Sequence, residues 1–316
     1  MSKLFAVLCA GALMWPAATL AQSWQPAAPA ERCPSKWGAA DERGAANYMR
    51  PETVLRATQL IKTGEVIELG WALTMDMPLF GTRRFDLHTK RTGGPMGTNR
   101  RYTNEELVIT ELGQVGTQFD MFSHQSIDGL HYNCIKTDDI ATRNGFTKLG
   151  VEKIGMLFTR GVLVDVAALK GVDMLPQNYE ITVDDIQTAL TKEGTTIQPG
   201  DAVLIHTGFG KLWGKDNAKY NAGCPGIGVA AAEWLAKQDV MLLGADNFPV
   251  EVAPNPDKNL SLPVHQIALA VNGNFLLENM KLDELAAKRV YEFALIVQPL
   301  KIKGGTGSTV APVAVR

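Results

Sequence analysis

The sequence has little of several features that mark specialised protein classes. Of its 316 residues only four are cysteine and five are histidine, and 31 Lys and Arg nearly balance 33 Asp and Glu. Because there is no basic excess, we expect no nucleic-acid partner. The cysteines have no spacing typical of a zinc ribbon. Charge runs, internal repeats and low-complexity segments are also absent, which leaves an ordinary globular composition.

One apolar run stands at the start of the chain. Lys3 precedes the apolar stretch 4–15, and the small residues of "TLAQ" follow it. This order predicts a secretory signal peptide, residues 1–21, cleaved after Ala21. The run is short for a membrane span and Pro16 follows it closely, although a retained anchor is the alternative. We therefore expect a periplasmic or secreted protein with no stable membrane span after cleavage.

Three cysteines remain after such cleavage: Cys33, Cys134 and Cys224. An exported protein can pair two of them and leave one free, and the sequence does not say which two. We expect Cys134 and Cys224 to be structural rather than nucleophilic, because no histidine forms a recognisable dyad pattern with either.

The apolar pattern predicts an α/β fold with a mixed sheet. Residues 22–34 are rich in Pro and Ala, and we expect an N-terminal arm over 22–50 followed by a single catalytic domain over 51–316. In the second half, strands alternate with helices, whereas the first half is β-rich and adds antiparallel pairing. Predicted helices cover 51–63, with Pro51 in the first turn, and 182–194, with Thr182 at the cap and Asp185 three residues later. Further predicted helices cover 228–239 and 262–271, and predicted strands cover 65–75, 106–113, 115–121, 156–166, 201–210, 240–246, 275–280 and 291–302.

A long polar segment, "FGTRRFDLHTKRTGGPMGTNRRYTN" (80–104), interrupts the β-rich half. A stretch of this length without regular structure is usually functional or disordered in a compact domain. His88 could reach substrate from this loop or simply be solvated. Arg83 and Arg84 could attract an acidic substrate or only solvate the loop.

The stretch "GQVGTQFDMFSHQSIDG" (113–129) places Gln114, Gln118, Asp120 and His124 at even positions. Alternate residues of a strand share a face, so the Cα atoms of Gln118 and Asp120 would lie about 6.6 Å apart and both side chains could reach one ion. Gln114 and His124 could join them only if the chain bends at Gly116 and at "SHQSIDG". The pattern leaves two interpretations open, a bent metal site and a polar sheet face.

A second cluster lies in "PVHQIALAVNGNFLLEN" (263–279). His265 begins an apolar helical stretch, and Glu278 ends an apolar strand. A buried glutamate needs a partner or a metal, but both residues could also stand at the surface. Farther on, the glycines of "GGTGS" would let the backbone at Thr306 approach a substrate closely.

The sequence resembles the cyclase family that includes bacterial kynurenine formamidases and isatin hydrolases. "GTQFDMFSH" is similar to the family signature His-x-Gly-Thr-His-x-Asp-x-Pro-x-His. The stretches "WGAADERGAANYM", "GCPGIGVAAAEWLA", "VMLLGADN", "PVHQ…NGNFLLENMKLDEL" and "GGTGS" resemble the family's longer branch in the expected order.

This resemblance implies a β/β/α fold and hydrolysis of amide or ester-like bonds with one or two divalent ions. The implied catalytic histidine is His124. The implied metal positions are Gln114, Gln118, Asp120, His265 and Glu278. Glutamine replaces both motif histidines, and Phe122 replaces the motif proline. Because a glutamine oxygen is a harder and weaker ligand than imidazole, we expect a single Mn²⁺ or Zn²⁺, with the balance shifted towards Mn²⁺.

We therefore expect a metal-dependent hydrolase of the arylformamidase or cyclic amide or lactone hydrolase type. The ion would activate a water molecule, His124 would act as the base, and His88 and Thr306 would contact a small cyclic or aromatic substrate. Two alternatives are open: a cyclase or lyase that uses the same ion, and a periplasmic small-molecule-binding protein that has lost catalysis. We also expect a homo-oligomer.

Overall fold

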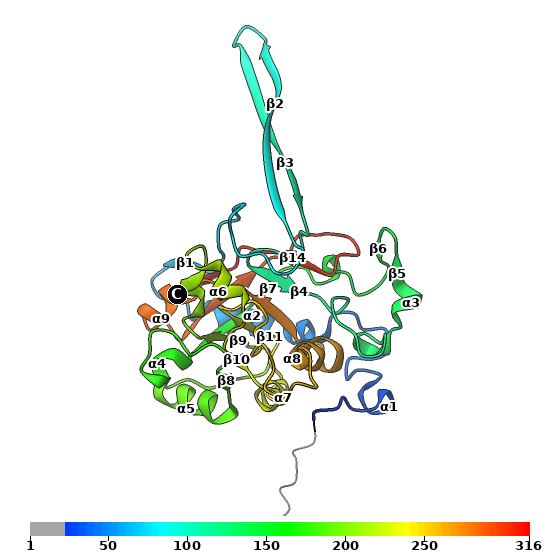
Figure 1. Cartoon of the computed structure of the whole chain (residues 1–316), viewed down its shortest axis with the longest axis vertical. Coiled ribbons are helices and arrows are strands. Elements are labelled where there is room, and N and C mark those ends of the chain that lie inside the picture. Colours follow the sequence, from blue (N-terminus) through cyan, green and yellow to red (C-terminus); the bar gives the residue numbers. More distant parts are fainter. Residues whose placement is uncertain (1–22) are drawn as a thin grey trace, which may run out of the picture.

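The computed structural model describes residues 23–316, so the predicted signal peptide lies outside the described part of the chain. Within these residues, nine strands form one mixed sheet (Figure 1), which confirms the predicted α/β class. In spatial order the strands are β1 (Val66–Glu68), β15 (Val313–Val315), β13 (Glu292–Val297), β7 (Leu157–Asp165), β9 (Ala202–His206), β11 (Leu242–Ala245), β12 (Phe275–Glu278), β4 (Gln118–Asp120) and β14 (Gly307–Thr309).

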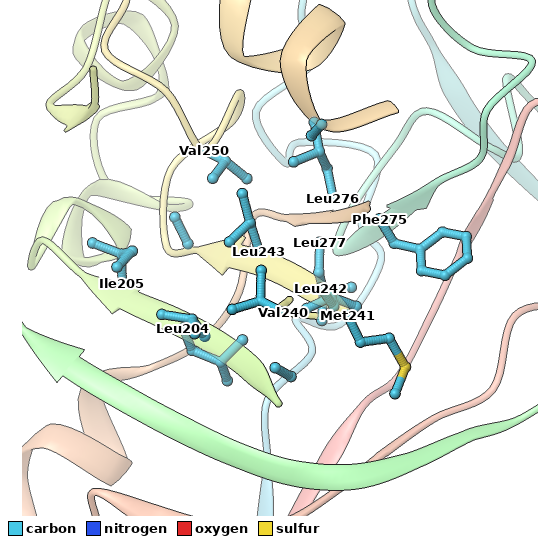
Figure 2. Close-up of a cluster of buried hydrophobic side chains, with 14 of the residues drawn as sticks. Leu204, Ile205, Val240, Met241, Leu242, Leu243, Val250, Phe275, Leu276 and Leu277 are labelled. Atoms are coloured by element: carbon cyan, nitrogen blue, oxygen red, sulfur yellow. The ribbon is translucent and has the colours of Figure 1, made fainter. Parts of the chain in front are cut away.

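The centre of the sheet is parallel and its two margins are antiparallel. Strands β7, β9, β11 and β12 run parallel, whereas β4 pairs antiparallel with both β12 and β14. The parallel strands are buried along nearly their whole length, as expected for strands covered on both faces. Figure 2 shows their side chains packed together, including Leu204, Leu243 and Leu276 from three adjacent strands.

The helices follow local sequence signals. Pro51 occupies the first turn of α2, and Thr182 with Asp185 forms a capping box at the start of α5, as predicted. The predicted helix over 262–271 starts as α8 and continues as a wider π-helical segment, Gln266–Asn272. The helices are α1 (Pro29–Arg32), α2 (Pro51–Thr58), α3 (Thr137–Ile140), α4 (Val166–Lys170), α5 (Val183–Glu193), α6 (Asn217–Asn221), α7 (Val229–Lys237), α8 (Pro263–His265) and α9 (Asp283–Ala287).

The polar segment predicted as a loop over 80–104 is instead mostly a long hairpin, which corrects the sequence prediction. Strand β2 (Phe85–Met96) pairs with β3 (Arg101–Thr110), and the hairpin projects far from the body (Figure 1). The hairpin is hard to predict from the sequence because both of its faces are mostly exposed, so no apolar face alternates with a polar one. Two-residue strands form the smaller pairs β5 (Ala141–Thr142) with β6 (Gly145–Phe146) and β8 (Glu180–Ile181) with β10 (Gly226–Ile227).

The first described residues, from 23 onwards, pack on the body of the protein. A disulfide joins Cys33 to Cys134, 101 residues later, and Cys224 is a buried free thiol. Trp24 Nε1 donates to Glu233 Oε1 at 2.9 Å. Among residues 23–316, no helix has the length and apolar character needed to cross a bilayer.

Candidate metal centre

The site is built on the pairing of β4 with β12. Their antiparallel register sets Gln118 opposite Glu278, and Asp120 lies two residues farther along β4. Gln118 Nε2 donates to Glu278 Oε2 at 2.7 Å. Gln118, Asp120 and Glu278 are all buried. Period-two alternation therefore brings the two β4 side chains together, as the sequence predicted.

His265 reaches the same point from α8. Its Nε2 lies 3.1 Å from Glu278 Oε1 and 3.7 Å from Asp120 Oδ2. On the other side of the ring, Nδ1 lies 2.6 Å from Glu251 Oε1. Glu251 also accepts from the backbone N–H groups of Val264 and His265. The Glu251 carboxylate accepts a hydrogen bond from Nδ1–H, so when the ring is neutral its lone pair is on Nε2, directed into the site.

Gln114 and His124 join the cluster because the chain bends on both sides of β4. Gly116 adopts a left-handed φ of +66°, and after β4 the backbone N–H of His124 donates to Met121 O at 2.8 Å in a tight turn. His124 Nε2 lies 3.9 Å from Asp120 Oδ2. Of the two interpretations left open by the sequence, the structure has the bent cluster and not a polar sheet face.

The amide of Gln114 is oriented by its neighbours. Its Oε1 accepts from Arg83 Nη2 at 3.1 Å, and its Nε2 lies 3.3 Å from Asp120 Oδ1 and 3.2 Å from His124 Nδ1. Arginine has only donors and an ionised aspartate only acceptors, so the amide cannot be reversed. His124 Nδ1 therefore accepts, and the neutral ring carries its proton on Nε2. When both rings are neutral, His124 therefore directs a protonated Nε2 into the site, whereas His265 directs an unprotonated Nε2 into it.

The donor set fits a divalent ion. One ligand atom each from Asp120, His124 and His265 lies within 4.8 Å of the others. Two oxygens in the cluster, Asp120 Oδ2 and Gln118 Oε1, are buried and without a hydrogen-bond partner. Buried polar atoms are nearly always satisfied, and oxygen ligands of this kind suit hard ions such as Mn²⁺. The arrangement can therefore hold a metal that satisfies the two oxygens.

The electrostatics of the site follow from burial and close packing of charges. Burial and the neighbouring Asp120 raise the pKa of Glu278 to about 7. Burial opposes a charge on His265, but Glu251 and Glu278 outweigh it and hold the pKa of His265 well above its usual range. Burial lowers the pKa of His124, and the positive charges of His265 and Arg83 act in the same direction although Asp120 opposes them.

A narrow pocket leads to the cluster. Arg83, Gln114 and Gln118 line it, together with Pro78, Phe80, Val115, Gly116, Tyr220, Asn221, Phe248 and Asn279. The rings of Phe80 and Phe248 stack with their centroids 4.9 Å apart. The pocket thus combines an aromatic wall with one guanidinium, next to the proposed ligands.

The two residues predicted to contact substrate, Thr306 and His88, lie at different distances from the cluster. Thr306 lies beside the site, where its carbonyl accepts from the backbone N–H of Met121 at 2.9 Å. His88 is exposed on the projecting hairpin and forms no hydrogen bond with the cluster in the described part of the chain. Sequence reasoning missed Glu251. The pattern that drew attention to Glu278, a glutamate in an apolar stretch, is also present at Glu251, which lies between Val250 and Val252.

Comparison with known proteins adds a family match. The sequence profile described as "Putative cyclase" matches residues 67–252. A crystal structure described as a novel cyclase has a TM-score of 0.82 and 33% identity, covering 89% of this chain and 96% of that chain. A search of curated proteins finds no match.

Two more distant structures share the fold. Isatin hydrolase A from Ralstonia solanacearum has a TM-score of 0.57 and 23% identity, covering 80% of this chain and 92% of that chain. A protein described as a predicted metal-dependent hydrolase from Bacillus stearothermophilus has a TM-score of 0.52 and 19% identity, covering 79% of this chain and 97% of that chain. The expected fold and the expected resemblance are both confirmed.

Proposed function

Because this chain belongs to the cyclase family, we propose that it is a metal-dependent hydrolase that opens an amide or lactone bond in a small cyclic or aromatic substrate. The observation that carries the proposal is the convergence of Asp120 Oδ2 and His265 Nε2 beside Glu278, with the Asp120 oxygen buried and unpartnered. Two fold relatives, described as isatin hydrolases, support the substrate class. The stacked Phe80 and Phe248 offer a flat apolar wall that suits an aromatic ring.

We assign the ligands to Asp120, His265, Glu278 and Gln118, the last through its unpartnered Oε1. Two carboxylates would balance the charge of a dication, and Glu251 would hold His265 in the form that binds metal. Gln114 uses both ends of its amide in hydrogen bonds. Its role is therefore to position Asp120 and His124 rather than to bind the ion. A set this rich in oxygen favours Mn²⁺ over Zn²⁺.

When bound, the ion would polarise the scissile carbonyl and lower the pKa of a water molecule. His124 handles the proton of the leaving group. Its Nδ1 accepts from Gln114, so the neutral ring has its proton on Nε2. The Nε2 proton would go to the leaving nitrogen or oxygen as its bond to the carbonyl carbon breaks, and the proton released by the attacking water would replace it on Nε2, so the ring is neutral before and after the step. His124 thus serves both as the acid for the leaving group and as the expected base for the water.

Arg83 recognises the substrate from the mouth of the pocket. Its guanidinium is fixed by Gln114 and lies among the pocket residues. A guanidinium binds a carbonyl or carboxylate oxygen well. Thr306 comes directly before β14, which pairs with β4 on the side away from β12, and we propose that its backbone approaches the substrate there.

We also propose that the protein is exported and that residues 51–316 form the catalytic domain. The disulfide between Cys33 and Cys134 supports export, because such bonds persist in oxidising compartments. N-terminal sequencing of protein from its native compartment tests this proposal. A chain starting after Ala21 supports it, and an intact Met1 in reducing cytosol contradicts it.

The experiment that tests the activity is metal analysis of the purified protein, followed by a panel of cyclic amides, lactones and aryl formamides with Mn²⁺ restored. We expect one ion per chain and hydrolysis of at least one member of the panel. A protein that holds no stoichiometric ion and leaves all of them intact would instead be a binding protein. Ring closure or elimination without uptake of water would indicate a cyclase or lyase.

A further inference from the structure

A second cavity lies between the N-terminal arm and the body of the protein. It has a volume of about 300 Å³, and residues 27–48 of the arm line one side of it. The other side consists of body residues, among them Tyr132, Asp239 and Asn274. None of these lining residues belongs to the pocket at the metal centre. Ligand sites of proteins start at about this volume, so the cavity is large enough for a small molecule.

Covalent and hydrogen bonds fix the arm at this cavity. The disulfide between Cys33 and Cys134 joins the arm to the body, and Cys33 directly follows the lining residue Arg32. Tyr132, which also lines the cavity, donates through its hydroxyl to Asp41 Oδ2 of the arm at 2.9 Å. The cavity is therefore formed in advance, as most small-molecule sites are.

Several buried polar atoms of the lining residues have no hydrogen-bond partner within residues 23–316. They are Nε and Nη1 of Arg32, Nε1 of Trp37 and Oδ1 of Asn274. Asn274 is only 3% exposed, and its Nδ2 donates to Val240 O at 2.5 Å, so the oxygen is the end of the amide that lacks a partner. Buried polar atoms nearly always have partners. A few such atoms on the residues of one cavity are typical of a ligand site.

The charges of the cavity indicate what the ligand carries. Within the described residues Arg32 has no ion-pair partner, and burial lowers the pKa of Arg32 although Asp128 opposes this. Lys36 also lines the cavity, but it forms an ion pair with Asp239 at 2.5 Å. The remaining acidic side chain of the lining, Glu31, is exposed. A carboxylate on the ligand would therefore complement the guanidinium of Arg32.

The other lining residues add hydrogen-bonding and aromatic requirements. The indole nitrogen of Trp37 can only donate, and the oxygen of Asn274 can only accept. The rings of Trp37 and Tyr48 pack edge to face with their centroids 5.0 Å apart, and Tyr132 adds a third ring to the lining. Aromatic side chains of this kind bind a flat ring well. A matching ligand thus combines a ring, an acceptor and a donor.

We propose that this cavity is a second ligand site, for a small aromatic carboxylate that carries an N–H or O–H group. The carboxylate would accept from Arg32 and Trp37, and the N–H or O–H group would donate to Asn274 Oδ1. Hydrolysis of an aromatic cyclic amide or lactone puts both groups on one molecule, because opening the ring with water yields a carboxylate and a free N–H or O–H. The identification of the ligand as such a product rests on the proposed function, whereas the site itself does not.

Isothermal titration calorimetry with 2-aminobenzoate tests the site in the purified protein. We expect binding with a dissociation constant of about 1 mM or lower, a usual strength for a ligand of this size. The uncharged 2-aminobenzamide keeps the ring and the amine, and it should bind about 10-fold more weakly or not at all because it lacks the carboxylate. Equal binding of the two compounds would contradict recognition by Arg32.

Variants of the lining residues locate the binding. Arg32→Gln should raise the dissociation constant of 2-aminobenzoate about 10- to 100-fold, the usual contribution of a hydrogen bond to a charged group. Trp37→Phe removes one neutral donor and keeps a ring, so it should raise the constant about 5-fold. Arg50→Gln is the matched control, since Arg50 is exposed and does not line the cavity, and it should bind like the parent chain. Circular dichroism checks that each variant is folded.

The same titrations define the results that would overturn the site. No binding by the parent chain would mean that the cavity holds only water, and unchanged binding by a folded Arg32→Gln would mean that the ligand sits elsewhere. Binding that is lost in Arg83→Gln but kept in Arg32→Gln would assign the ligand to the pocket at the metal centre. The titration needs no catalysis, so a chain that binds 2-aminobenzoate through Arg32 but hydrolyses nothing supports the site and contradicts only the proposed function.

Discussion

Gln118 and Glu278 face each other across β4 and β12, and Gln118 Nε2 donates to Glu278 Oε2 at 2.7 Å. This hydrogen bond takes the nitrogen end of the amide, so the oxygen end is left buried without a partner. One cross-strand pair thus contributes both a carboxylate and an unpartnered amide oxygen to the buried cluster. We propose that this oxygen replaces the histidine nitrogen of the family signature as a metal ligand.

Gln118→His should shift the metal preference. Imidazole nitrogen is a softer ligand than an amide oxygen, so binding of Zn²⁺ should tighten relative to Mn²⁺. Competitive titration of the two ions into the apoprotein measures this ratio. Gln59→His, at an exposed position after α2, is the control and should not change it. An unchanged ratio in Gln118→His would remove Gln118 from the ligand set.

Glu278→Gln should empty the site while keeping its shape. The substitution preserves the volume of the side chain but removes one of the two carboxylates that balance the ion. We expect loss of stoichiometric metal by plasma emission spectroscopy, together with loss of turnover. Asp138→Asn changes an exposed acid on α3 and should retain both. Full metal occupancy in Glu278→Gln would show that the ion sits elsewhere.

His124→Gln should keep the metal but lower turnover by roughly 10²–10⁴-fold, the usual contribution of a positioned acid or base. Gln114→Leu should also lower turnover with the metal retained, because it removes the donor that fixes the proton of His124 on Nε2. Steady-state kinetics combined with metal analysis separates the two effects. If His124→Gln loses the metal, His124 is a ligand and the assignment as acid is wrong.

His206, outside the metal centre, should make stability depend on pH. Burial opposes its charge, but the hydrogen bond to Asp165 and the nearby carboxylates of Asp283 and Asp246 outweigh burial and raise the pKa of His206 to about 10. The folded pKa exceeds that of the unfolded chain, about 6.5. The stabilisation is therefore complete below about pH 6.5 and is lost as the pH rises towards about 10.

His206→Gln should accordingly lower the free energy of unfolding by about 3 kcal/mol near pH 6, the usual cost of breaking a buried ion pair. The difference from the parent chain should narrow as the pH rises to about 10. Urea unfolding at several pH values measures it. A difference that does not change with pH would mean that His206 is neutral in the folded protein.

Removing the disulfide should destabilise the protein. Cys33 and Cys134 are 101 residues apart, and in the chain-entropy model a bond that closes a loop of this size contributes about 4.7 kcal/mol. Cys33→Ala should lower the free energy of unfolding by that amount, measured by urea denaturation. Addition of dithiothreitol should affect the parent chain and leave Cys33→Ala unchanged. Equal sensitivity of both proteins would show that the bond does not form.

The local arrangements of this protein could be predicted from its sequence. Alternation along a strand was enough to bring Gln118 and Asp120 to one face, because the period of two is a property of the extended backbone. The capping box at Thr182 was likewise readable, since its contacts lie within one helical turn. The need of a buried Glu278 for a partner followed from the cost of burying a charge.

The contacts between groups far apart in the sequence depend on the tertiary fold and could not be predicted. The contact of Glu251 with His265 and that of Arg83 with Gln114 join different elements, and these contacts fix the protons of His265 and His124 on opposite nitrogens. The pairing of Cys33 with Cys134 also depends on how the chain returns on itself. The spacing of residues along one strand or helix does not predict these contacts. They depend on the order and register of the strands, which are determined by the packing of the whole sheet. The projecting hairpin escaped prediction for a different physical reason: beyond Phe85 at its base, most of its side chains are exposed in the described structure, so burial left no pattern in its sequence.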